Sequence, residues 1–250
     1  MRIEWKRHCG VVLWLTLAGL AQAGDREVAL ETVDQAIKAH GGEATLNRAL
    51  TFVRTASGTL HTFAKPLPFK DQLTVQLPER FRSSVEVGEQ DTKFRLVVVI
   101  NKDTGWQQSG GATMELTKER LGELREEAYV LYLTTLTPLK KDSGMELTPL
   151  PEGKVNDAPV IGIKVSQKGH ADSKLYFDKN THLLVKIERR VTEAGLLVTK
   201  EYLYSDHKNF GGVKLPGKMI ESMNGRKVSE VSSFNYQFPN RAEESAFGKP

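Results

Sequence analysis

The side chains that could carry out metal or acid–base chemistry are scattered along this 250-residue sequence. His40, His61, His170, His182 and His207 share no ligand spacing, and no HExxH motif accompanies them. The glycines after His40 favour a position at the end of a helix, and His182 falls in an expected turn. We therefore assign structural roles to these histidines and expect no metal site.

Motifs for covalent or phosphate chemistry are also missing. The sequence contains no G-x-S-x-G, no P-loop and no G-x-G-x-x-G, and no Ser-x-x-Lys begins a long helix. The adjacent acids Glu126 and Glu127 favour solvated charge over a pair of carboxylates facing each other across a cleft. We expect no catalytic residues, no cofactor and a non-enzymatic function, with a hydrolase of unknown type as the least favoured alternative.

The charge balance narrows the choice of partner. The chain carries 35 Lys and Arg against 31 Asp and Glu, a formal net charge of +4. Basic and acidic residues are interleaved instead of clustered, so nucleic acid is excluded as a partner. The one cysteine, Cys9, lies near the N-terminus. The rest of the sequence therefore has no disulfide and no thiol nucleophile.

The first 23 residues have the layout of a secretory signal peptide. Arg2, Lys6 and Arg7 precede an apolar run at residues 11–20, and Ala21-Gln22-Ala23 matches a small-x-small cleavage site. The run is too short to remain as a membrane span. Because Cys9 precedes the apolar run, lipid anchoring at the cleavage point is rejected. We expect cleavage after Ala23, export, and a single domain over residues 24–250.

Hydrophobic periodicity predicts an N-terminal helix followed by a sheet. Val28, Val33 and Ile37 recur at helix spacing, and Gly41-Gly42 stops the helix. A second helical turn is expected at residues 43–50. Apolar and polar residues then alternate, which is typical of an antiparallel meander. The expected strands cover residues 73–77, 81–87, 94–100, 160–165, 174–178, 183–191, 196–204, 213–222 and 227–238.

One helix interrupts the expected sheet at residues 121–136. Leu121, Leu124 and Ala128 recur at helical steps, and Pro138 ends the helix. From Tyr129 to Leu136 both faces are apolar, so the helix needs cover on both sides. Ordinary burial between the sheet and the N-terminal helix is the simpler interpretation. The functional interpretation is that one face lines a cavity for an apolar ligand.

The candidate ligand-binding residues are Trp106, Tyr129, Leu133 and Leu136. The residues expected to pack the helix against the sheet are Leu121, Leu124, Ala128 and Tyr132. Tyr129, Leu133 and Leu136 are then available to line the cavity. Trp106 is equally a candidate for the cavity mouth and for the core. We expect Leu133→Glu to abolish uptake of a fluorescent fatty acid if the fold stays intact, because a charge inside an apolar cavity is costly.

Two stretches carry a resemblance. Residues 175–188 (LYFDKNTHLLVKIE) are similar to a recurrent YFD-x-x-T-x-L-L-x-x-x-E hairpin, and residues 204–216 close on a similar GVKLP strand end. The chain thereby resembles the LolA/LolB-like superfamily of periplasmic outer-membrane lipoprotein-sorting proteins. Gly41-Gly42, Gly105-Trp106 and the closing Phe247-Gly248-Lys249-Pro250 also fit this superfamily.

The resemblance implies a mainly β (α+β) fold, an incomplete antiparallel β-barrel with helices packed in its concave face. It further implies a monomeric periplasmic protein that binds or carries lipoprotein acyl chains or another lipid, with an envelope membrane protein as a further partner. Burial of each CH₂ group is worth about 0.8 kcal/mol, so acyl chains supply affinity without chemistry. The alternative function is an envelope-stress sensor or adaptor module with the same fold.

Overall fold

A computed structural model describes residues 15–62, 64–89 and 93–250, with side chains from residue 24 onward. The predicted n-region, with Arg2, Lys6, Arg7 and Cys9, lies outside the described residues. The described residues contain four α-helices and a short 3₁₀ helix near the C-terminus. They are α1 (Leu15–Ala39), α2 (Glu43–Arg48), α3 (Lys118–Thr134), α4 (Pro138–Lys141) and η2 (Glu244–Phe247). No helix in the described part of the chain is long and apolar enough to cross a membrane.

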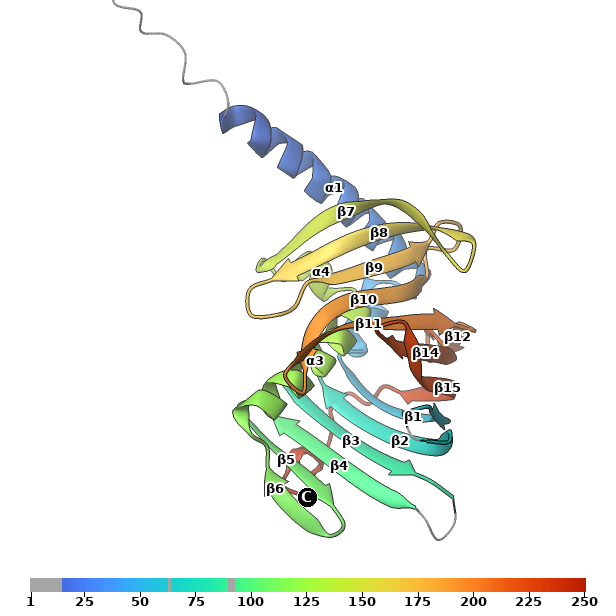
Figure 1. Ribbon diagram of the computed structural model, residues 1–250. Helices are drawn as coiled ribbons and strands as arrows, with labels where there is room; N and C mark the ends of the chain where they lie inside the picture. The colour runs from blue at the N-terminus through green and yellow to red at the C-terminus, as the bar shows by residue number, and fades with distance from the viewer. Residues whose placement is uncertain (1–14, 63, 90–92) are drawn as a thin grey trace, which may run out of the picture.

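A single curved sheet of 13 antiparallel strands dominates the fold (Figure 1). Its strand order is β6-β5-β4-β3-β2-β1-β15-β14-β11-β10-β9-β8-β7, and β12 and β13 form a separate ribbon. The two edge strands, β6 and β7, do not meet, so the sheet is not closed. The strands are β1 (Thr51–Leu60), β2 (Leu67–Gln76), β3 (Arg80–Val87), β4 (Phe94–Asn101), β5 (Thr104–Ser109), β6 (Ala112–Glu115), β7 (Met145–Val155), β8 (Ala158–Gln167), β9 (Ser173–Asp178), β10 (Leu184–Glu193), β11 (Leu196–Ser205), β12 (Lys208–Phe210), β13 (Val213–Leu215), β14 (Lys218–Met223) and β15 (Arg226–Gln237).

Pairing of β1 with β15 joins the two halves of the sheet. One half contains β1 to β6, and the other contains β7 to β11 with β14 and β15. The register shifts between Ser57 and Gly58 on β1, where the two strands approach closely. A Cβ atom at Gly58 would clash with the carbonyl oxygen of Glu230 on β15. The joint therefore requires glycine at this position.

The N-terminal helix ends where the sequence predicts. Gly41 and Gly42 have φ angles of 116° and 86°, and the Gly42 amide donates to the Ile37 carbonyl oxygen over 2.8 Å. Glycine adopts this left-handed region without steric cost, which explains the stop. The helix begins earlier than expected, at Leu15, so the predicted cleavage site after Ala23 lies within α1.

Helix α3 occupies the hollow of the sheet (Figure 1). The Thr117 side chain accepts a hydrogen bond from the Arg120 amide over 3.2 Å and caps its first turn. Leu121 and Leu124 pack on the half of the sheet that contains Leu73, as predicted. The helix is shorter than expected, because it ends at Thr134 before α4 begins at Pro138. The prediction of an incomplete antiparallel barrel with helices in its concave face is confirmed.

Several strands were not predicted from the sequence. No strand was expected at β5, β6 or β7, and the expected strand at residues 213–222 is split into β13 and β14. Pro149 and Pro151 explain why β7 was missed, since proline is rare within strands except at a sheet edge. The edge position of β7 is consistent with this rule. This strand packs against α1, and its Met145 and Leu147 belong to the same buried cluster as Leu133 of α3.

Candidate functional site

A cavity of about 260 Å³ lies between α3 and the concave face of the sheet. This volume is near the lower end of the ~300–1,000 Å³ typical of small-molecule pockets. The size suits one apolar chain better than several. The apolar side chains that line it are Leu46, Ala49, Phe52, Leu73, Phe81, Leu124, Val130, Leu131, Leu184, Leu215, Pro216, Met219, Phe234 and Phe238.

One stripe of α3 faces this cavity. Leu124, Glu127, Leu131 and Thr134 lie three and four residues apart, which places them on the same side of a helix. Across the cavity, Tyr236 on β15 contacts the rings of Phe52, Phe210, Phe234 and Phe238 at centroid distances between 5.0 and 6.3 Å. The cavity wall opposite α3 is therefore largely aromatic.

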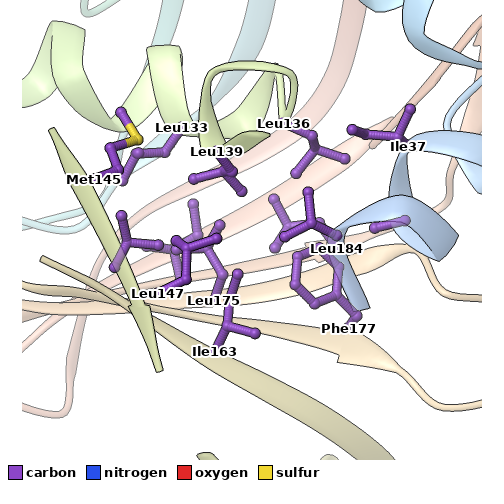
Figure 2. Close-up of a cluster of buried hydrophobic side chains, with 14 of the residues drawn as sticks. Ile37, Leu133, Leu136, Leu139, Met145, Leu147, Ile163, Leu175, Phe177 and Leu184 are labelled. Atoms are coloured by element: carbon purple, nitrogen blue, oxygen red, sulfur yellow. The ribbon is translucent and has the colours of Figure 1, made fainter. Parts of the chain in front are cut away.

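The structure places two of the predicted ligand-binding residues in the packed core. Leu133 and Leu136 are fully buried (Figure 2), together with Leu139, Met145 and Phe177. Neither lines the cavity. Both faces of this part of α3 are covered by sheet, and β7 to β10 cover the face that carries Leu133. The helix is therefore rotated relative to the sequence-based expectation, which assigned the cavity to that face.

Tyr129 and Trp106 also lie away from the cavity lining. Tyr129 is buried, and its ring stacks on His170 at a centroid distance of 3.8 Å, beside a separate polar cleft. Burial raises the pKa of its phenol above the usual value. Trp106 on β5 packs with Val97, Val99 and Phe247. The structure does not bring the four predicted residues together in one site, and ligand contact by them stays a prediction.

Acidic residues of α3 form ion pairs that the sequence interpretation missed. Glu127 Oε1 lies 2.9 Å from Lys200 Nζ, and the Tyr202 hydroxyl donates to Glu127 Oε2 over 3.0 Å. Glu126 instead pairs with the fully buried Arg189 and lies 2.8 Å from His170 Nδ1. The interpretation of these two acids as solvated charge was wrong. Consecutive helical residues point in different directions, so each reaches a different partner on the sheet.

A sequence signal for these pairs does exist. Lys200 follows Val198 and precedes Tyr202 on the inward face of β11, where alternation predicts an apolar residue. Arg189 stands in the same way between Ile187 and Val191 on β10. A basic residue at an inward strand position indicates a buried acidic partner, because an unpaired buried charge is strongly disfavoured.

Arg54 and Glu221 are the other charged residues that line the cavity. Arg54 Nη2 lies 2.9 Å from Asp71 Oδ2, and the Ser83 hydroxyl donates to Asp71 Oδ1 over 2.9 Å. Glu221 Oε2 accepts a hydrogen bond from the Ser229 hydroxyl over 3.1 Å. Burial, and then the nearby carboxylate of Glu127, raise the pKa of Glu221 above its usual value.

The cavity wall combines apolar side chains with a few charged groups. Within the described ranges, no group of three His, Cys, Asp or Glu side chains could hold a metal ion. The charged residues of the cavity wall pair with residues behind the wall, and most of the remaining wall is apolar. Such an arrangement can hold an apolar chain and place a few charged groups beside its head.

Comparisons with solved structures identify the fold. No protein-family model and no curated protein matches the sequence. A LolA superfamily protein from Nitrosomonas europaea superposes with a TM-score of 0.52 at 13% identity, covering 82% of this chain and 96% of that chain. A domain assigned to outer membrane lipoprotein sorting, from Vibrio parahaemolyticus, superposes with a TM-score of 0.55 at 12% identity, covering 90% and 97%. A DUF1329 family protein from Desulfovibrio piger has a TM-score of 0.55 at 10% identity, covering 88% and 97%.

These likenesses establish a LolA-like fold, as the motif resemblance predicts. They span most of this chain and nearly all of each compared chain. At 10–13% identity they show the fold alone. The function must therefore be argued from the cavity.

Proposed function

We propose that this protein is a non-enzymatic binder or carrier that holds one acyl chain of a lipid or lipoprotein in the cavity beneath α3. The observation that carries the proposal is a largely apolar cavity between a helix and the concave face of an open sheet. About ten buried methylene groups would supply about 8 kcal/mol, before the cost of association is subtracted. Shape and apolar area are therefore sufficient to retain such a ligand.

In this proposal the protein acts in the periplasm. The predicted signal peptide at residues 1–23 supports export, and the likeness to a lipoprotein-sorting domain supports work in the cell envelope. A carrier must receive its cargo from one site and release it at another. An envelope membrane protein is accordingly the expected second partner.

Uptake of a neutral fluorescent lipid, a labelled long-chain alcohol, tests the proposal. The wild-type protein should bind it saturably, and Leu131→Trp should weaken binding at least tenfold by filling the cavity from α3. Leu197→Trp is the matched control, because Leu197 is 60% exposed at the start of β11 and does not line the cavity. Circular dichroism should show the same fold in all three proteins.

Two results would contradict the carrier function. In the first, the wild-type protein shows no saturable uptake of any long-chain lipid or lipopeptide. In the second, Leu131→Trp binds as well as the wild type although its fold is intact. After the first result, the sensor or adaptor function with the same fold takes its place.

A further inference from the structure

Charge beside the cavity is unbalanced. Lys200 Nζ lies 2.6 Å from Glu193 Oε2, 2.9 Å from Glu127 Oε1 and 3.9 Å from Glu221 Oε1. The Lys200 side chain is only 7% exposed, whereas the side chains of Glu127, Glu193 and Glu221 are 34%, 33% and 22% exposed. The ammonium group of Lys200 is therefore shared by three carboxylates, and two of these, Glu127 and Glu221, line the cavity.

Glu221 is the least compensated of the three. Its hydrogen-bond donor, the Ser229 hydroxyl, carries no charge. In the described part of the chain its nearest cation is Lys200, which lies 3.9 Å away and also pairs with Glu127 and Glu193. Arg54 is the other cation of the cavity wall, but Asp71 neutralises it at 2.9 Å. The Glu221 side chain is partly buried, with 22% of its surface exposed. A partly buried carboxylate without a close cation is unfavourable. A positive group entering the cavity would relieve this cost.

The surroundings of Glu221 define the shape of such a ligand. Tyr202 and Tyr204 on β11 and Met219 on β14 line the cavity beside it, and the aromatic wall continues beyond them. An apolar chain in the cavity would thus bring its head group to Glu221 and Glu127. An anionic head would be repelled there, a neutral head would leave the charge unbalanced, and an ammonium head could donate up to three hydrogen bonds.

We propose that the cavity prefers amphiphiles with one ammonium group at the end of an apolar chain, seated between Glu221 and Glu127. This inference rests on the lipid-binding function proposed above and adds the chemical class of the head group. The tyrosine rings beside the site would further favour a cation.

Competition among three ligands with the same twelve-carbon chain tests the preference. Dodecylammonium, dodecanol and dodecanoate each displace the neutral fluorescent probe phenylnaphthylamine, at neutral pH and below their micelle concentrations. Dodecylammonium should bind about tenfold more tightly than dodecanol, as expected for one charge-assisted hydrogen bond, and dodecanoate should bind most weakly. Glu221→Gln should remove the advantage of dodecylammonium while dodecanol still binds.

The matched control is Glu201→Gln. Glu201 lies on β11 between Lys200 and Tyr202, does not line the cavity and pairs with Lys186, so the preference should persist in this variant. Glu127→Gln provides a second test if Glu221→Gln fails to fold. Equal binding of all three ligands by the wild type, or a preference kept in both cavity variants, would overturn the inference and leave the lipid-binding function standing. If neither the probe nor any of the ligands binds, both proposals fail.

Discussion

His40 shows how a single side chain can be held in one protonation state. It is 1% exposed, its Nδ1 lies 2.6 Å from the Lys214 carbonyl oxygen, and its Nε2 lies 3.0 Å from the Leu184 amide. The carbonyl requires a proton on Nδ1 and the amide requires a lone pair on Nε2, so the ring must be neutral. Burial is the main reason that its pKa falls from 6.5 to about 4.

This histidine should make stability depend on pH. Its folded pKa lies below its unfolded value, so its contribution is complete above pH 6.5 and is lost as the pH falls towards 4. The loss amounts to at most about 3 kcal/mol, from about 1.36 kcal/mol per pKa unit. Urea unfolding across this range should show a steeper fall for the wild type than for His40→Gln, which should already be less stable at neutral pH. Nitrogen NMR that finds the His40 ring charged at about pH 5.5 would contradict the assignment.

Among the secondary-structure elements, α3 carries its core residues and its cavity-lining residues on different sides. Leu133 is fully buried against the β7 half of the molecule, whereas Leu131 lines the cavity on another side of the helix. Leu133→Ala should lower the free energy of unfolding by about 2–5 kcal/mol, as for other buried leucines. Leu131→Ala should cost clearly less, because the side chain already borders empty space. Denaturant titration of both variants checks the difference.

This arrangement of α3 changes what is expected of Leu133→Glu. A charge at this fully buried position has no partner among its apolar neighbours, so the variant should unfold instead of losing uptake selectively. Circular dichroism decides between the two outcomes. A folded Leu133→Glu protein that has lost only lipid uptake would restore the sequence-based assignment of this residue to the cavity.

At the scale of the whole molecule, the joint between β1 and β15 holds the two halves of the sheet together. Gly58→Val should destabilise the protein by several kcal/mol, because its side chain would clash with the Glu230 carbonyl and with Phe69 Cε1, 2.9 Å from the Cβ position. Hydrogen exchange should show the largest loss of protection along β1 and β15. Gly110→Ala in the β5–β6 turn is a control in open space at φ 57°, and it should cost only about 1 kcal/mol. Equal effects of the two changes would contradict the role of this joint.

Features that depend on local interactions could be predicted from the sequence. Gly41-Gly42 end α1, Asn224-Gly225 form the turn between β14 and β15, and Asp178 accepts the amides of Asn180 and Thr181 in the β9–β10 turn. Each of these needs only the conformational range of its own residues, or a hydrogen bond to a neighbour in the chain. Alternation likewise located most strands and, with the motifs, the LolA-like fold.

The side chains that face the cavity could not be predicted from the sequence, because their selection depends on long-range packing. The second half of α3 is apolar on both faces, so its periodicity does not distinguish the face that packs from the face that lines a cavity. That choice depends on how α1 and the strands β7 to β10 pack around Leu133, and the prolines of the edge strand β7 obscure its pattern. The partners of Glu127 are also distant in sequence, since Lys200 and Tyr202 lie 73 and 75 residues from it. Such pairs form only when the strands are brought together, because no local interaction selects them.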